Sequence, residues 1–262
     1  MTLFWDAETA SLSEAIIRER TRPFERPTPP GPFDPASVKC GNIGGPDSEK
    51  GKAKIEKART DYEAEVAKFE ADAAKAETDY WRKKVDEAAL SAATGRVVAI
   101  GCLSAENDKT LILGEDDPDE AAMLAKFWNL YRNMKAKRRA MVGVNILLFD
   151  LPFIVRRSWI LDVPVPGTLR VNHGRYWDET FVDLRDVWLL GQRWGDCESS
   201  LDHMAKTLGV GSKSDGLAGE CTGKTFAQMW ESGDAHQRAA ARAYLVNDLR
   251  LPQQIAARMG IV

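Results

Sequence analysis

The sequence contains few cysteines and histidines, and their spacing does not suit the structures that these residues usually build. The four cysteines form no CxxC pair, and together with the three histidines they show no spacing typical of zinc ligands. This excludes a zinc finger and a disulfide framework. Thiols without partners fit a reducing compartment, so we expect a cytoplasmic protein.

The sequence also lacks an excess of positive charge and a long uninterrupted hydrophobic run. Its formal net charge is -3, which excludes a strongly basic protein that coats nucleic acid, although local patches can still bind phosphate. The most apolar stretch, residues 141–155, is interrupted by Asn145 and Asp150, and no basic segment precedes an apolar one at the N-terminus. We therefore expect a protein that is neither exported nor membrane-bound.

What the sequence does contain is enough apolar material for one large core. With 262 residues, 44% hydrophobic and 29% charged, it suits a single domain over residues 1–262 that carries an insertion. The insertion, residues 47–89, is rich in Ala, Lys and Glu and has apolar residues at helical spacing. One helix of this length would measure about 60 Å, so we expect a projecting arm or a helical hairpin. Two roles stay open: a stripe packed on its own domain, or an arm that forms a coiled coil or clasps DNA.

The rest of the chain alternates between the patterns of strands and helices. Five stretches have the composition of strands: residues 3–5, 96–103, 109–114, 140–144 and 181–184. Three have the periodicity of helices: residues 123–134, a segment that begins at 151, and residues 235–259. Prolines between residues 20 and 46 predict an irregular connector that wraps the surface, and a further hairpin is expected around residues 172–174. The order predicts an α/β protein with a mixed sheet flanked by helices.

Four carboxylates lie in three separated segments where they can converge. Asp6 and Glu8 point to the same side of the first predicted strand, and Asp150 lies at a predicted helix N-terminus directly after a strand. Tyr244 and Asp248 lie one turn apart on one face of the last predicted helix. Carboxylates that meet repel each other unless a cation lies between them. Oxygen ligands from three elements suit Mg²⁺ or Mn²⁺ far better than zinc.

These residue types fit phosphodiester hydrolysis with two divalent cations. In such sites the ions lie about 3.5 to 4 Å apart, one activating water and the other stabilising the leaving oxygen. A tyrosine has a pKa of about 10, which is too high for an efficient general base at neutral pH. We therefore assign Tyr244 to orienting the attacking water.

In combination these residues resemble the DEDD superfamily of 3′–5′ exonucleases, which have an RNase H-like fold. Three motifs carry the resemblance: Asp6-Ala7-Glu8-Thr9, Asn145 with Phe149-Asp150, and Tyr244 with Asp248. The tyrosine indicates the tyrosine subgroup, because the histidine subgroup would have His where Ala243 stands. Similar stretches occur within residues 33–42, 88–97 and 200–210. The chain looks most like stand-alone exonucleases related to the proofreading domain of family B DNA polymerases.

The resemblance implies an RNase H-like α/β fold with a five-stranded mixed sheet. The long helical insertion after the first strand is a departure from the family pattern. The resemblance also implies a catalytic set that includes Tyr244 and the four metal ligands Asp6, Glu8, Asp150 and Asp248. It places three residues near the terminal nucleotide: Thr9, Asn145 and Phe149. The implied reaction is hydrolysis of single-stranded DNA from its 3′ end to nucleoside 5′-monophosphates, with two Mg²⁺ or Mn²⁺ ions. Aromatic residues that stack on bases would help to hold an unpaired end.

Other interpretations remain open at this point. One alternative is an exoribonuclease of the same fold, and another is a non-catalytic nucleic-acid-binding or scaffold protein that uses the long helix for assembly. Each of three site residues also has a structural interpretation when it is considered alone. Asp150 could cap a helix N-terminus, Asp248 could lie on an exposed helix face, and Tyr244 could pack at the edge of the core. Asp183 is either a fifth acidic neighbour or a structural residue at a strand end, and the structural role is favoured.

Overall fold

The computed structural model describes residues 2–167, 169, 171–172, 175–176, 179–193, 195 and 197–261. The chain divides into two compact units. Unit 1 comprises Met1–Ser13 and Ala88–Val262, and unit 2 comprises Glu14–Glu87.

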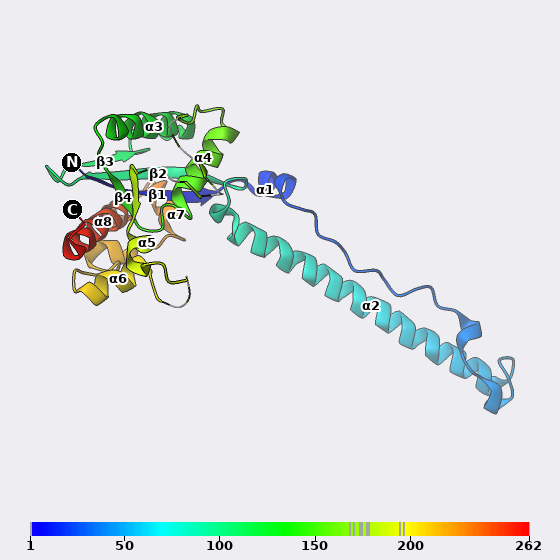
Figure 1. Cartoon of the computed structure of the whole chain (residues 1–262). Helices are drawn as coiled ribbons and strands as arrows, with labels where there is room; N and C mark the ends of the chain where they lie inside the picture. Colours follow the sequence, from blue (N-terminus) through cyan, green and yellow to red (C-terminus); the bar gives the residue numbers. More distant parts are fainter. Residues whose placement is uncertain are drawn as a thin grey trace. The chain divides into compact units, whose positions relative to one another are not determined.

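Unit 1 is built on a five-stranded mixed sheet with the strand order β3-β2-β1-β4-β7 (Figure 1). Its strands are β1 (Leu3–Ser11), β2 (Gly95–Ser104), β3 (Thr110–Leu113), β4 (Met141–Gly143) and β7 (Phe181–Asp183). The β1, β2 and β3 strands pair antiparallel, whereas β4 runs parallel to both β1 and β7. This confirms the predicted α/β architecture, with β1 as the central strand.

Helices cover both faces of the sheet, and the alternation of side chains along β1 explains why. One face carries α3 (Glu120–Ala136) and α4 (Asp150–Ile160), and the Trp5 ring packs there against Phe127 at 5.0 Å between centroids. The opposite face carries the long helix α8 (Ala235–Met259), where Phe4 joins a cluster that includes Leu249. The α8 helix has the bounds that its periodicity predicts. Figure 1 shows these layers above and below the sheet.

The remaining elements of unit 1 are short. They are β5 (Val171–Asn172), β6 (Arg175–Tyr176), α5 (Leu184–Leu189), α6 (Leu201–Leu208) and α7 (Phe226–Trp230). The β5 and β6 strands pair antiparallel, as the predicted hairpin requires, while residues 173 and 174 of its turn lie outside the described residues. No helix in the described part of the chain combines the length and the hydrophobicity that crossing a membrane requires.

The first strand is longer than predicted. Its composition indicates a strand over residues 3–5, but its pairing with β2 continues to Ser11. The extension is stable because Ala7 remains buried on the face that α3 and α4 cover, while pairing with β2 continues to Ser11 beyond a shift in register between Glu8 and Thr9. As a correction to the prediction, Asp6 and Glu8 therefore lie within the central strand and not at its end.

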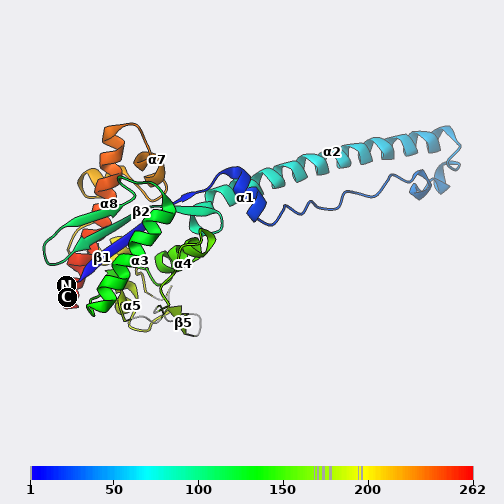
Figure 2. The same ribbon diagram turned by 90° about the horizontal axis from the view of Figure 1, so that it is seen from above.

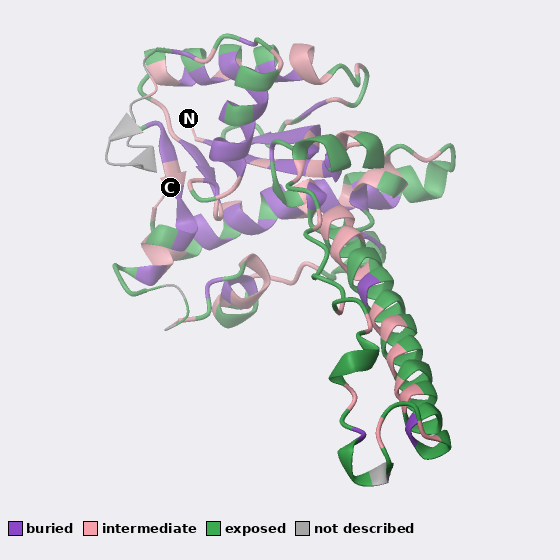
Figure 3. Cartoon of the chain, turned by 90° about the vertical axis from the view of Figure 1, so that its right-hand side faces the viewer, coloured by how far each residue is buried: buried purple, intermediate pink, exposed green. Residues whose placement is uncertain are grey.

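Unit 2 contains α1 (Glu14–Arg20) and α2 (Glu49–Asp86). The inserted residues form one helix of 38 residues, about 57 Å long at 1.5 Å per residue, and not a hairpin of two helices. Ser48 caps its N-terminus by accepting a hydrogen bond from the backbone N–H of Gly51 at 3.0 Å. Most of the helix surface is exposed (Figure 3).

The proline-rich connector between α1 and α2 runs antiparallel along α2 (Figures 1 and 2), which corrects the prediction of a segment that wraps the surface. Three hydrogen bonds set this arrangement, each donated by an α2 side chain to a carbonyl of the connector: Tyr80 to Arg22 (2.5 Å), Tyr62 to Gly31 (2.8 Å) and Lys54 to Lys39 (2.8 Å). The rings of Phe24 and Phe33 pack on the same two tyrosines, each at 5.6 Å. Prolines donate no backbone hydrogen bond, so the helix supplies the donors. The apolar stripe of α2 thus packs within unit 2.

A buried ion pair in unit 1 joins α4 to α3. Arg157 donates from Nε and Nη2 to the two carboxylate oxygens of Glu120 at 2.9 and 2.7 Å, and from Nη1 to the carbonyl of Ala92 at 3.1 Å. Glu120 also accepts the backbone N–H of Val97 in β2 at 2.8 Å. This network holds α4, and therefore Asp150 at its first turn, against the sheet.

Replacing Glu120 with Ala should lower the free energy of unfolding by about 3 kcal/mol, because it leaves the Arg157 charge buried without its partner. Glu115→Ala is the matched control, since Glu115 pairs with Arg242 at 2.7 Å on the surface and its loss should cost less than about 1 kcal/mol. Urea denaturation of the full chain, followed by near-ultraviolet circular dichroism, measures both. Equal losses would contradict the structural importance of the buried pair.

Candidate metal centre and active site

Three carboxylates from two elements converge on the face of the sheet that α8 covers. The cluster consists of three carboxylate oxygens, one each from Asp6, Glu8 and Asp248, and all three lie within 4.8 Å of one another. Glu8 and Asp248 are only 8% and 5% exposed, and Asp6 is partly buried. Asp248 therefore does not lie on an exposed helix face, as one interpretation of the sequence allows.

A glycine in β2 allows α8 to approach β1 this closely. Gly101 pairs with Asp6 across the two strands. A Cβ atom at Gly101 would lie 2.9 Å from Cδ1 of Leu249 and 3.0 Å from Cδ1 of Leu245, so a larger residue would require these leucines to shift. These two leucines flank Asp248 on α8, so the bare backbone at Gly101 lets the helix carry Asp248 to the strand acids.

Asp150 occupies the first residue of α4 and is 5% exposed. It lies outside the group within 4.8 Å, but the Asp6 carboxylate is close enough to raise its pKa. The N-cap position belongs to Phe149, which forms no side-chain cap hydrogen bond. The Asp150 side chain therefore does not serve as the helix cap that its position in the sequence suggests.

The turn between β4 and α4 depends on one glycine and one left-handed residue. A Cβ atom at Gly143 would lie 2.4 Å from Cγ2 of Ile146 and 2.7 Å from the carbonyl oxygen of Trp5. Asn145 has φ 64°, a conformation that asparagine tolerates better than most residues. The chain can therefore reverse sharply after β4 and start α4 with Asp150 beside the sheet.

Asp183 has the structural role that the sequence favours. Its carboxylate accepts backbone N–H groups of Asn145 at 2.8 Å, Leu147 at 3.0 Å and Arg185 at 3.0 Å. Burial raises the pKa of Asp183, although these hydrogen bonds oppose the rise. The Asn145 side-chain oxygen in turn accepts a hydrogen bond from the Arg185 guanidinium. Asp183 thus holds the turn that leads to Asp150.

The other two residues expected near the terminal nucleotide also make contacts within the protein. The Thr9 hydroxyl donates to the carbonyl of Ala89 at 2.8 Å, and the Phe149 ring packs on Phe153 at 5.7 Å between centroids. Both side chains are partly exposed. Contact of Thr9, Asn145 and Phe149 with a nucleotide stays a prediction.

Sequence reasoning missed Lys213, which lies in the loop after α6. Its Nζ is 2.6 Å from a carboxylate oxygen of Asp248 and 4.8 Å from the centroid of the Tyr244 ring. The loop is anchored because the Lys213 backbone N–H donates to Asp202 at 2.9 Å, and the Asn247 amide donates to the Lys213 carbonyl at 3.4 Å. No local pattern marks this residue. The only signal would have been that a buried acidic cluster needs a cation.

Burial raises the pKa of all four carboxyl groups, and repulsion by neighbouring carboxylates adds to the rise for Asp6, Glu8 and Asp150. Burial, followed by the Asp248 charge, raises the pKa of Asp6 to about 7. The pKa values of Glu8 and Asp150 rise well above the ordinary range because of burial, and next because of Asp6. Burial raises the pKa of Asp248 as well, but its ion pair with Lys213 opposes the rise. Ionisation of this cluster is therefore unfavourable without a further cation.

The donor set fits a hard divalent cation. One Asp248 oxygen pairs with Lys213, whereas the other, Oδ1, is buried and has no hydrogen-bond partner among the described residues. An unsatisfied carboxylate oxygen beside two further carboxylates is the environment that Mg²⁺ or Mn²⁺ would complete. Such a cation would also remove the repulsion that raises these pKa values.

Tyr244 borders the cluster from α8 and also packs in the core. Its ring lies 6.1 Å from that of Phe226, so the core-edge interpretation describes part of its environment. Burial, and then the Asp248 charge, raise the pKa of Tyr244, so the hydroxyl is neutral at physiological pH. A Cβ atom at Gly223 would lie 3.7 Å from that hydroxyl, which shows that the loop before α7 passes close to it.

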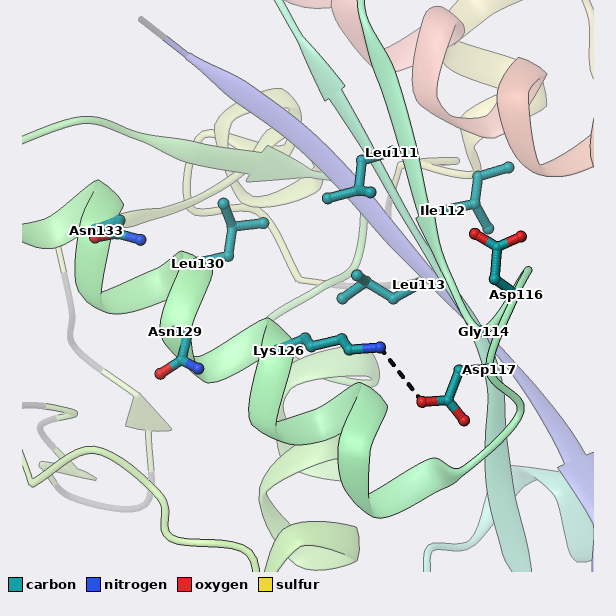
Figure 4. A pocket seen from close by; sticks show the side chains of 10 residues that line it. All are labelled: Leu111, Ile112, Leu113, Gly114, Asp116, Asp117, Lys126, Asn129, Leu130 and Asn133. Carbon is teal, nitrogen blue, oxygen red and sulfur yellow. Dashed lines mark hydrogen bonds and ion pairs between the residues drawn. The ribbon is translucent and has the colours of Figure 1, made fainter.

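A groove elsewhere on unit 1 contains none of these acids. It has a volume of about 480 Å³ and lies between β3 and α3, with Leu111 and Leu130 in its lining (Figure 4). An ion pair of 3.4 Å between Lys126 and Asp117 crosses one end of it. The candidate site is therefore the acidic cluster and not this groove.

A comparison with protein families identifies the class of protein that carries this acidic cluster. Residues 89–248 match the model of a family described as "Predicted 3'-5' exonuclease related to the exonuclease domain of PolB". Because the match spans more than half of the 262 residues, the chain belongs to this family of 3′–5′ exonucleases. The family implies a nucleic-acid substrate. A comparison with curated proteins finds no match.

The matched region includes three of the five residues expected in the catalytic set: Asp150, Tyr244 and Asp248. Asp6 and Glu8 precede it, as does α2. For the two strand acids, the support comes from their position beside Asp248.

Replacing Asp6 with Asn should stabilise the metal-free protein at neutral and alkaline pH. Between the ordinary pKa of 3.8 and the folded value of about 7, the folded state keeps a proton that the unfolded state has lost, so stability falls as the pH rises. We expect a gain of about 1 to 3 kcal/mol at about pH 8 and a smaller gain at about pH 5. Thermal melts with a chelator measure both.

Asp162→Asn, an exposed change just beyond the far end of α4, is the control and should show little dependence on pH. A gain from Asp6→Asn that is equal at both pH values would contradict the proposed repulsion.

Proposed function

We propose that this chain is a metal-dependent exonuclease of the tyrosine subgroup of the DEDD superfamily, with an RNase H-like domain. It would hydrolyse single-stranded DNA from the 3′ end to nucleoside 5′-monophosphates, with unit 2 as an insertion in one functional domain. The observation that carries the proposal is the convergence of Asp6, Glu8 and Asp248 within 4.8 Å, in a chain whose family is one of 3′–5′ exonucleases.

The four acids would hold two divalent cations, Mg²⁺ or Mn²⁺. Asp6, Glu8 and Asp248 supply the compact part of the site, and Asp150 supplies a carboxylate on its Asp6 side. When bound, such ions lower the pKa of water and stabilise negative charge on the leaving oxygen of a phosphodiester. The rigid positions of β1, α4 and α8 would keep the acids in place before substrate arrives.

Tyr244 and Lys213 would act beside the acids without exchanging protons in the reaction. The neutral Tyr244 hydroxyl can hydrogen-bond to the attacking water and orient it, since its raised pKa rules out a role as base. The Lys213 ammonium would balance part of the acidic charge through Asp248. Thr9, Asn145 and Phe149 would contact the terminal nucleotide, which must be unpaired to enter.

The most direct prediction concerns turnover. The chain with Mg²⁺ or Mn²⁺ should shorten 5′-labelled single-stranded DNA stepwise from the 3′ end. Asp150→Asn should lower the rate at least about 100-fold, because a bound cation contributes several kcal/mol of transition-state stabilisation. Asp162→Asn, at the other end of α4, should leave the rate unchanged.

The same assay separates the alternatives. Faster degradation of a labelled RNA of equal length would identify an exoribonuclease. Release of no nucleotide with either metal, or equal rates for the parent chain and Asp150→Asn, would contradict the proposal and favour a binding or scaffold protein.

Tyr244→Phe should slow turnover by about 10- to 100-fold, less than the loss of an acid, because it misplaces the water but leaves the metal ligands intact. Single-turnover kinetics at saturating DNA measure the effect, and circular dichroism checks the fold. Tyr62→Phe, which removes a hydroxyl from α2, serves as the control. Unfolding of Tyr244→Phe would show that this hydroxyl serves the core rather than the reaction.

A further inference from the structure

The first turns of α2 carry a concentration of cations that the proposed active site does not use. Residues 50–59, here called the basic end of α2, contain five cations and one acid, Glu56. All five cations are exposed: Lys50, Lys52, Lys54, Lys57 and Arg59. The following residues, 60–79, reverse the balance with seven acids and two lysines. The charge of α2 is therefore divided along its length.

The stability of the helix does not explain this arrangement. The positive pole of the helix dipole lies at the N-terminus and acts within the first turn, so it is unfavourable for Lys50 and Lys52. Like charges four residues apart, as at Lys50 and Lys54, also repel. Lys50, Lys52 and Lys57 form no ion pair among the residues that the structure describes. Contacts among the described residues therefore do not account for these three cations.

The connector holds part of the basic end in place. The Lys54 ammonium donates to the Lys39 carbonyl at 2.8 Å, and the Arg59 guanidinium lies 5.9 Å from the centroid of the Phe33 ring. Lys50, Lys54 and Lys57 follow the i, i+4, i+7 spacing, which puts them on one helix face over about 10 Å. The result is a row of positive charge on a supported helix end, with Lys39 beside it.

We propose that the basic end of α2 binds the sugar–phosphate backbone of nucleic acid as a site separate from the acidic cluster. Lysine ammonium groups act as point charges for phosphate and read no base sequence. A polyanion would relieve the repulsion among neighbouring lysines and release its own counterions. The choice of nucleic acid among polyanions rests on the proposed function, since the family acts on nucleic acid.

Two double variants of the full chain test this inference. Lys50→Gln/Lys57→Gln removes two charges from the basic end. Lys68→Gln/Lys75→Gln is the matched control, because it removes the same charge from the same helix face at the same seven-residue spacing, within the acidic stretch. All four lysines are exposed, so neither variant should disturb packing.

The readout is fluorescence anisotropy of labelled single-stranded DNA, titrated with each protein at several salt concentrations in the absence of metal. The slope of log affinity against log salt should fall in magnitude by about 1.4 for Lys50→Gln/Lys57→Gln, since each phosphate contact contributes about 0.7 with single strands. The control should keep the slope of the parent chain. Equal losses in both variants, or no loss in either, would overturn the inference.

Hydrolysis of the p-nitrophenyl ester of thymidine 5′-monophosphate separates this inference from the proposed function. The ester occupies only the active site, so both double variants should hydrolyse it at the rate of the parent chain. A loss confined to Lys50→Gln/Lys57→Gln would place these lysines in the reaction itself and overturn the inference. If the parent chain leaves the ester intact, the proposed function fails, whereas the binding measurement still stands.

Discussion

Repulsion among buried carboxylates is the constraint on which the rest of unit 1 depends. Glu8 and Asp248 are almost fully buried within 4.8 Å of Asp6, and their raised pKa values show that ionisation opposes the fold. Such an arrangement persists only where rigid elements enforce it. A central strand provides two acids, and a helix brought close by the bare backbone of Gly101 provides the third. Without a cation the cluster therefore lowers the stability of unit 1, which agrees with the trade-off expected of the proposed active site.

Much of the fold could be predicted because its signals are local. The two-residue alternation that put Asp6 and Glu8 on one face holds in β1, and the four-residue spacing of Tyr244 and Asp248 holds in α8. Hydrophobic periodicity also located α3, and strand composition located β2 and β3. Each of these features depends on how often side chains repeat on the buried face of one helix or strand. The sequence of that helix or strand is therefore sufficient to predict it.

What the sequence did not reveal depends on contacts between distant residues. The full length of β1 follows from its pairing with β2, and the course of the proline-rich connector follows from tyrosines of α2 that donate to its carbonyls. Lys213 reaches Asp248 only because Asp202 and Asn247 anchor its loop. The alternation and spacing of a single segment contain no information about such partners.

The central claim is that the acidic cluster is a divalent metal site, and anomalous X-ray diffraction from crystals of the chain soaked in Mn²⁺ tests it most directly. We expect an anomalous peak within coordination distance, about 2.2 Å, of the Asp6, Glu8 and Asp248 carboxylates, with a second beside Asp150. Manganese bound only elsewhere on the protein, with the Asp248 oxygen Oδ1 still lacking a ligand, would contradict it.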